Sequence, residues 1–251
     1  MTLNVVGVVC ALASEARHLG PTTRRHQPLT SLTDGTLLAV SGMGIAAAAQ
    51  SARALVGAGA GALVSWGMAG GLDPELAAGT VFLPAEVVST EGGAVTTNQR
   101  WRERLGEAIR AGVPRGGGAV GSPGTGLVTH GKLLTTGKSV GSRTDKANLF
   151  RQTGAAAVDM ESLAIAEIAR AHQLPFIAVR VIVDNAADAL PRAVTAAADA
   201  EGHLQVWRLM GELVRAPGEL APLLRLAQRY RAANRSLAAV ARAGALADSL
   251  S

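Results

Sequence analysis

Short apolar runs that alternate with segments of helical pattern constrain the fold of this chain most strongly. The apolar runs favour buried strands, because they are rich in valine, leucine and isoleucine and are only as long as a strand. They read LNVVGVVCAL, TLLAV, GALVSW, KLLTT and PFIAVRVIVDNA. Most are followed by a glycine turn or a helical segment. This alternation predicts an α/β fold with a central mixed β-sheet flanked by helices in three layers.

The composition indicates one large domain. The chain has 251 residues, of which 48% are hydrophobic, and this is enough for a sizeable core. Aromatic residues make up only 3%, so alanine, valine, leucine and the 30 glycines must build that core by close approach of the backbone. We expect residues 1–251 to form a single domain, with residues 190–251 as its helical C-terminal extension.

Charge and cysteine content exclude several classes of protein. The formal charge is +5 and the pI is near 10.3, yet no basic stripe interleaved with aromatic residues supports nucleic-acid binding. Cys10 is the only cysteine, which excludes an internal disulfide, and no pair of histidines has the helical spacing of a zinc site. The run VVGVVCALA is too short to cross a membrane and lacks the flanks of a signal peptide. We therefore expect a cytoplasmic protein without a resident metal.

Two glycine-rich motifs suggest nucleotide binding but are incomplete. GMGIAA, residues 42–47, fits the dinucleotide fingerprint, which also requires an acid about 20 residues later for the ribose. No acid occurs between Asp34 and Asp73. GLVTHGKL, residues 126–133, nearly matches a phosphate-binding loop, but Leu133 stands where a hydroxyl should bind magnesium. A tight turn between a strand and a helix explains the first motif more simply than an NAD site.

The stretch AAAVDMESLAIAEIARAH, residues 155–172, has the pattern of an alanine-rich helix. Asp159 and Glu161 lie at its start, where carboxylates favour the positive end of a helix dipole. The alternative is that one of them holds a substrate, since chemistry in α/β sheets collects at the C-terminal ends of strands. By the same rule the other segments of interest are those around Glu15 and the motifs SGMG, SWGMAGG, TTGK and VIVDNA.

Four segments, taken in order, resemble the purine nucleoside phosphorylase superfamily. They read VVCALASEARHLG, SGMGIAAAA, SWGMAGGLDPELAAGTVFLP and AVDMESLAIAEIARAHQLPFIAVRVIVDNA. The general pattern is most similar to methylthioadenosine/S-adenosylhomocysteine nucleosidases. The opening VGVVCALASEARHLG, the motif VDMES and the long basic tail also resemble the hopanoid-associated phosphorylase branch, which is similar to nucleosidases acting on adenosylhopane. The resemblance implies a nucleoside phosphorylase-like fold, a homodimer, and cofactor-free cleavage of the N-glycosidic bond of an adenine nucleoside.

The resemblance also implies roles for four residues, and the strand pattern adds Arg180. Glu15 matches the carboxylate that activates the attacking water, although its local pattern is that of an exposed acid beginning a helix. Glu161 matches the acid that holds the ribose hydroxyls, and Met160 matches the residue that packs on the ribose. Asp184 matches the acid that protonates N7 of the leaving purine. Arg180 shares a strand face with Asp184 and is expected to hold Glu15 or the attacking water, because a charge in so apolar a strand needs a partner.

Further substrate-binding residues are expected in the matching segments and, for Val140, in the region TTGKSVG between them. They are Met43, Gly44, Met68, Ala69, Gly70 and Val140. Three positions depart from the nucleosidase pattern: Met68 and Val183 stand where relatives have hydroxyl residues, and Val140 or a neighbour replaces the aromatic ring that stacks on the base. These apolar replacements indicate a substrate that is more hydrophobic than those of the nucleosidases. Asp159 is expected to be a supporting or surface residue.

Three functions remain open at this stage. Water is favoured as the nucleophile for two reasons. The carboxylate of Glu15 would repel phosphate, and Met68 stands where a hydroxyl side chain would contact phosphate. A phosphorylase with phosphate as co-substrate is the second hypothesis. A non-catalytic nucleoside- or lipid-binding protein is the third.

The C-terminal tail, residues 222–243, has the pattern of one amphipathic helix. Its apolar arc consists of Leu223, Leu226, Ala227, Tyr230, Leu237, Val240 and Ala241. Arg231, Arg235 and Arg242 lie on the opposite side, and Leu224 falls among them. Packing against the chain's own domain is the favoured interpretation, and peripheral contact with the inner membrane surface is the alternative.

Overall fold

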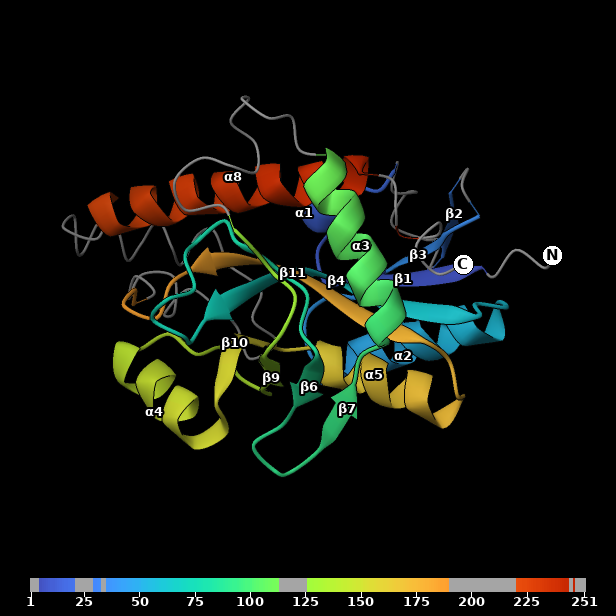
Figure 1. Ribbon diagram of the computed structural model, residues 1–251, viewed down its shortest axis with the longest axis horizontal. Coiled ribbons are helices and arrows are strands. Elements are labelled where there is room, and N and C mark those ends of the chain that lie inside the picture. The colour runs from blue at the N-terminus through green and yellow to red at the C-terminus, as the bar shows by residue number, and fades with distance from the viewer. Residues whose placement is uncertain are drawn as a thin grey trace.

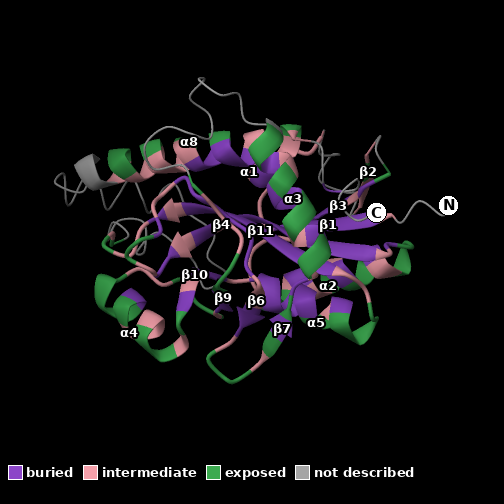
Figure 2. Ribbon diagram, viewed as in Figure 1, coloured by how far each residue is buried: buried purple, intermediate pink, exposed green. Residues whose placement is uncertain are grey.

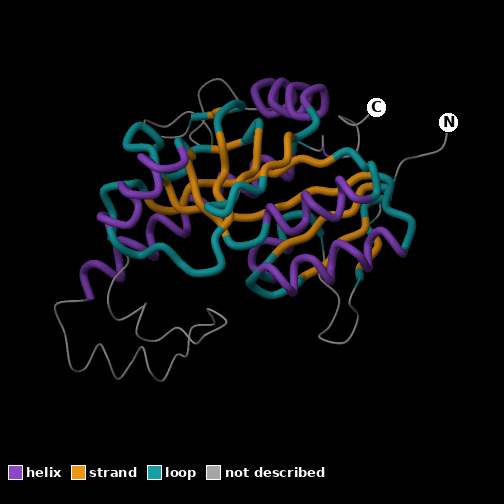
Figure 3. The backbone as a smooth tube through the Cα atoms, turned by 90° about the horizontal axis from the view of Figure 1, so that it is seen from below, coloured by secondary structure: helices purple, strands orange, loops and turns teal. Residues whose placement is uncertain are grey.

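The predicted α/β architecture is confirmed. The structure is a computed structural model, and it describes residues 5–20, 29–32, 35–112, 126–189, 220–243 and 246. Within these residues eleven strands form one mixed sheet, with helices on both of its faces (Figure 1). Seen after a quarter turn, the strands lie between two groups of helices, as expected for three layers (Figure 3).

Three buried strands form the centre of the sheet. β1 (Val6–Cys10) and β11 (Phe176–Asp184) both pair in parallel with β4 (Ala62–Gly71), on its two sides. Every residue of β1 is buried, because helices cover both faces of the sheet at this point. Parallel strands in such a setting carry continuous apolar runs, which is why the sequence predicts them well.

Shorter strands extend the sheet beyond this centre. β3 (Leu37–Val40) pairs in parallel with β1, and β2 (Thr30–Ser31) pairs antiparallel with β3. On the other side β5 (Val81–Phe82) pairs antiparallel with β11, and β8 (Leu127–Val128) pairs in parallel with β5.

The sheet forks at the C-terminal end of β4. There Gly70 and Gly71 pair antiparallel with β10 (Ala155–Asp159). β10 continues into a second arm through β9 (Lys132–Thr135), β6 (Glu86–Val88) and β7 (Ala94–Thr96). The fork brings the ends of β1, β4, β10 and β11 to one place.

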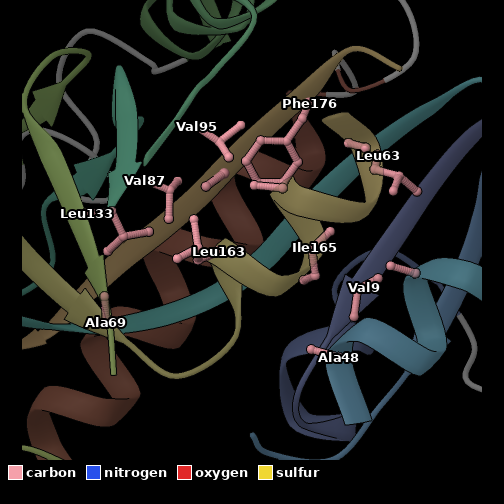
Figure 4. Packing of buried hydrophobic residues seen from close by; sticks show 14 of the residues in the cluster. Val9, Ala48, Leu63, Ala69, Val87, Val95, Leu133, Leu163, Ile165 and Phe176 are labelled. Atoms are coloured by element: carbon pink, nitrogen blue, oxygen red, sulfur yellow. The ribbon is translucent and has the colours of Figure 1, made fainter. Parts of the chain in front are cut away.

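Helices rich in alanine cover one face of the sheet. α2 (Ile45–Gly57) and α5 (Ser162–Ala171) pack there, and their fully buried Ala48, Ala52, Ala166 and Ala169 allow close approach to the strands and to each other. Figure 4 shows this core, with Val9 and Leu63 of the sheet beside Ala48 and Ile165 of the helices. Small side chains thus replace the aromatic residues that the composition lacks.

Larger side chains fill the opposite face. Trp66 of β4 and Trp101 of α3 (Gln99–Gly112) share this core with Leu237 and Val240 of α8 (Leu220–Arg242). The buried stripe of α8 faces the sheet (Figure 2), and Arg231, Arg235 and Arg242 are exposed. The C-terminal helix therefore packs on its own sheet, as the favoured interpretation expects.

Two sequence-based expectations about local structure are wrong. Residues 155–159 form strand β10 rather than the first turns of a helix, because pairing with β4 and β9 overrides the helical propensity of alanine. The motif SWGMAGG, where the sequence predicts a glycine turn after the apolar run GALVSW, instead continues β4, and its glycines lie against neighbouring backbone and acidic side chains. The stretch from Gly112 to Gly126 is rich in glycine and is expected from the sequence to form a loop, but residues 113–125 of it lie outside the described residues. Residues 190–219 of the expected helical extension also lie outside them.

Candidate active site

A pocket of about 230 Å³ opens where the sheet forks. Nine of the eleven residues predicted for the site line it: Glu15, Met43, Met68, Ala69, Gly70, Val140, Met160, Glu161 and Asp184. The pocket also includes Thr136, Lys138, Ser139, Val183 and Tyr230. Arg180 and Gly44 do not line it. The motifs that are far apart in the sequence therefore converge on one cavity, as expected for the C-terminal ends of strands.

Glu15 is seated by backbone amides. It lies on the short helix α1 (Ala13–Ala16), directly after β1, and is only 4% exposed. The amide of Leu12 donates to its Oε2 at 3.1 Å, and the amide of Met68 donates to its Oε1 at 3.0 Å. Burial raises the pKa of Glu15, and the positive charge of Arg180 opposes the shift. A buried carboxylate of raised pKa, facing a cavity, is suited to accept a proton.

Gly67 makes room for this carboxylate. A Cβ atom at Gly67 would lie 2.8 Å from Oε1 of Glu15, which is closer than van der Waals contact allows. The glycines of SWGMAGG therefore serve close approach rather than a turn.

Glu161 enters the pocket from the junction of β10 and α5. Its Oε1 accepts from the amide of Gly44 at 2.9 Å, and its Oε2 accepts from the amide of Met160 at 3.3 Å. Gly44 thus acts on the site through Glu161 rather than by lining the pocket. Burial, and then the charge of Asp159, raises the pKa of Glu161 to about 7.

Asp159 is a buried support. Its Oδ2 accepts from Nε and Nη2 of Arg180 at 3.0 and 2.6 Å, and its Oδ1 accepts from the hydroxyl of Thr135 at 2.7 Å. Both acids of VDMES line the pocket, but they differ in role: Asp159 is occupied by an ion pair with Arg180, whereas Glu161 accepts hydrogen bonds from backbone amides.

The expected role of Arg180 needs correction. Its guanidinium donates to Asp159, to the hydroxyls of Ser65 and Ser162, and to the carbonyl of Val179, and no hydrogen bond to Glu15 is among these. Arg180 acts on Glu15 only through its charge. The side chain needs a partner, as predicted, but that partner is Asp159, which pairing of β10 with β4 places beside β11.

Asp184 has a partner that the sequence did not suggest. Lys146, on α4 (Arg143–Thr153), donates from Nζ to Oδ2 of Asp184 and, at 2.9 Å, to the carbonyl of Asn185. Burial raises the pKa of Asp184, and Lys146 opposes the shift. One signal was present: Lys146, Leu149 and Phe150 share a helix face by their spacing, and that face packs towards the sheet.

Tyr230 is a second pocket residue that the sequence did not predict. It lies on α8, and its hydroxyl is 2.8 Å from the hydroxyl of Ser14. Its spacing identified only an apolar helix face, because contact with Ser14 depends on tertiary packing across the chain.

Comparison with known proteins identifies the family. The model of the phosphorylase superfamily matches residues 6–215. The chain belongs to this superfamily. It is therefore an enzyme with the nucleoside phosphorylase-like fold that the sequence predicts. Helix α8, and with it Tyr230, begins beyond the matched residues.

Relatives and solved structures agree with this assignment. The 5′-methylthioadenosine/S-adenosylhomocysteine nucleosidase of Mycobacterium bovis is 27% identical over 219 residues, covering 72% of this chain and 86% of that protein. The nucleosidase of Helicobacter pylori has a TM-score of 0.60 at 16% identity, over 74% of this chain and 87% of that one. Futalosine hydrolase from the same organism has a TM-score of 0.57 at 15% identity, over 72% and 88%. At such identities the two structures establish the fold alone.

The raised pKa of Glu161 predicts a pH-dependent stability penalty. A carboxyl group whose pKa is raised in the folded state stabilises the fold below its ordinary pKa, and this contribution is lost as the pH rises through about 7. Glu161→Gln should therefore raise the melting temperature, relative to the parent chain, more at about pH 8 than at about pH 5. Thermal unfolding followed by circular dichroism measures both differences.

The matched control is Glu167→Gln, which removes an exposed carboxylate from α5, the helix that begins directly after Glu161. Its effect on the melting temperature should be small and similar at the two pH values. Equal effects of Glu161→Gln on the melting temperature at the two pH values would contradict the raised pKa of Glu161.

Proposed function

We propose that this enzyme cleaves the N-glycosidic bond of a 5′-substituted adenine nucleoside, releasing adenine, with water as the nucleophile. The observation that carries the proposal is that three buried carboxylates, those of Glu15, Glu161 and Asp184, face one pocket at the ends of the central strands. Such a reaction requires that a water molecule is activated, that the ribose is held and that the charge on the leaving base is neutralised. Its transition state has the character of an oxocarbenium ion on the sugar.

Glu15 is suited to activate the water. Its carboxylate is fixed by the amides of Leu12 and Met68 and faces the pocket. Because burial raises its pKa, it holds a proton more readily than an exposed glutamate, which favours general base catalysis. Its negative charge also stabilises the developing positive charge on the sugar.

Glu161 and Met160 are suited to hold the ribose. In its ionised form Glu161 accepts strong hydrogen bonds from sugar hydroxyls, and Met160 beside it lines the same pocket. The amides of Gly44 and Met160 fix the carboxylate before substrate binds, so little reorganisation is needed.

Asp184 is suited to meet the leaving base. It lines the pocket at the end of β11, and a Cβ at Gly70 would lie 3.2 Å from its Oδ1, so the neighbouring strand leaves space around the carboxyl group. Protonation of purine N7 by this carboxyl group removes the negative charge that would otherwise remain on the departing adenine.

Water is favoured over phosphate because the site offers little to an anion on the side of Glu15. That carboxylate would repel phosphate, and the guanidinium of Arg180 is occupied by Asp159. Phosphorolysis remains the second candidate, since Lys138, Thr136 and Ser139 line another part of the pocket and offer a cation and hydroxyls. The reaction needs no resident metal or cofactor in either form.

The lining of the pocket favours an apolar 5′ substituent. Met43, Met68, Val140 and Val183 contribute apolar surface, and Tyr230 adds an aromatic ring from α8. We propose adenosylhopane, and thus hopanoid biosynthesis, as the context of the reaction, with a homodimer as the active form. A non-catalytic nucleoside- or lipid-binding protein is the remaining alternative.

Adenine release from a panel of 5′-substituted adenosines tests the proposal. The panel includes 5′-methylthioadenosine and adenosylhopane, each with and without phosphate, and chromatography separates the products. We expect adenine and a free sugar without phosphate, with the highest kcat/KM for large apolar substituents. Asp184→Asn and Glu161→Gln should each lower the rate about 100-fold or more, whereas Glu167→Gln should not.

Each alternative gives a different result in this assay. Strict dependence on phosphate, with ribose 1-phosphate as product, would select the phosphorylase. Binding of the nucleosides without product would select the binding protein. Full activity of both site variants would contradict the assignment of the site.

A membrane-surface role would suit a hopanoid nucleoside, which partitions into bilayers. Among the described helices none is long and apolar enough to cross a membrane. Leu224 of α8 is 55% exposed, and Arg225 and Arg231 near it are exposed too. An apolar side chain among exposed arginines is suited to an anionic lipid surface. We propose that the start of α8 touches the membrane beside the pocket.

Co-sedimentation of the full chain with anionic phosphatidylglycerol vesicles tests this contact. Leu224→Glu should lower the bound fraction severalfold, because it puts a charge where apolar contact is proposed. Ile45→Glu, at another exposed apolar residue, is the matched control and should bind like the parent chain. Equal binding of all three proteins would contradict the proposal.

A further inference from the structure

Lys146 is a buried cation on the face of α4 that packs towards the sheet, beside the partly buried Leu149 and Phe150. Its side chain has 0% exposure, and it is the only residue of α4 that is fully buried. Burial of an ammonium group is costly unless the group is paired and hydrogen bonded. Lysine is also a group whose proton can be removed within a protein, unlike the proton of arginine.

The two acceptors of Lys146 differ in what they can pass on. Nζ donates to Oδ2 of Asp184 and to the carbonyl oxygen of Asn185. A backbone carbonyl oxygen accepts a hydrogen bond but does not take up the proton, whereas a carboxylate can take up a proton and release it. Asp184 also lines the pocket, so it connects the buried ammonium to the place of the substrate.

This pairing creates a chemical difficulty for Asp184 as an acid. Burial raises the pKa of Asp184, but the neighbouring ammonium opposes that shift and favours the carboxylate form, which has no proton to give to the base. The pair as a whole nevertheless holds one proton that can move, because Lys146 carries it while Asp184 is ionised. As negative charge develops on the base, transfer through the carboxylate becomes favourable.

We propose that Lys146 holds the proton that Asp184 delivers to the leaving adenine. The inference rests on the proposed function. Water gives its hydroxyl to C1′ and its other proton to Glu15, while the bond from C1′ to N9 breaks and leaves its electron pair on the base. One proton moves from Nζ of Lys146 to Asp184, and one moves from Asp184 to N7. Turnover leaves Glu15 protonated and Lys146 neutral, and exchange with solvent after adenine departs restores both.

Lys146→Arg separates proton supply from charge. Arginine keeps a positive charge beside Asp184 but does not release its proton. The variant should lower kcat for adenine release about 100-fold or more, the usual contribution of general acid catalysis. The same variant should cleave a 4-nitrophenyl riboside with the same 5′ substituent almost as fast as the parent enzyme, because nitrophenolate leaves without protonation.

Two further variants make the comparison decisive. Lys146→Met removes the ammonium, so burial then favours a proton on Asp184 itself. This variant should therefore release adenine faster than Lys146→Arg, whereas the two variants should cleave the nitrophenyl riboside at similar rates. Lys132→Met changes a half-exposed lysine that lies 3.9 Å from Glu86 on the surface, and it should leave both rates unchanged. Circular dichroism confirms that each variant is folded.

The possible failures are distinguishable. No adenine from any substrate with the parent enzyme would overturn the proposed function and this inference with it. Adenine release by the parent enzyme and by Lys146→Arg at the same rate would overturn the inference alone. A parallel loss on both leaving groups would also overturn it, since that result assigns Lys146 a structural role.

Discussion

The site depends on the absence of side chains along the end of β4. A Cβ at Gly67 would meet the carboxylate of Glu15 at 2.8 Å, one at Gly70 would approach Asp184 Oδ1 at 3.2 Å, and one at Gly71 would lie 2.9 Å from the carbonyl oxygen of Asp184. These glycines let acids from both neighbouring elements approach one strand. The same glycines lie where β4 pairs with β11 on one side and with β10 on the other, so the fork of the sheet and the convergence of the carboxylates occur at the same residues.

Two buried ion pairs offset part of the cost of burying these charged side chains close together. Arg180 and Asp159 join β11 to the junction of β10 and α5, and Lys146 joins α4 to the end of β11 through Asp184. Buried pairs add little net stability, because desolvation opposes their attraction, but removal of one partner is strongly destabilising. The pairs differ in use. Arginine keeps its proton and fixes the position of Asp159, whereas lysine can release its proton and is paired with the acid that faces the pocket.

The sequence predicts the sheet better than the contacts within the site. β1 and β11 are recognisable because buried parallel strands carry continuous apolar runs, and the ordered motifs identify most of the pocket residues. Residues 155–159 were misread because alanine favours a helix until two neighbouring strands pair with it. Arg180 was correctly expected to need a partner, but the choice of Asp159 over Glu15 depends on packing. The spacing of Lys146 with Leu149 and Phe150 marks a helix face, but Lys146 lies 38 residues from Asp184, and no local pattern identifies Asp184 as its partner.

The central claim is that the pocket directs a water molecule, activated by Glu15, to the anomeric carbon of a nucleoside. The most direct measurement is mass spectrometry of the sugar product after a single turnover in water enriched in heavy oxygen, without phosphate and with enzyme in excess. The account predicts adenine together with a sugar that carries one heavy oxygen at C1′. A sugar phosphate formed only on addition of phosphate, or no cleavage of the nucleoside at all, would contradict it.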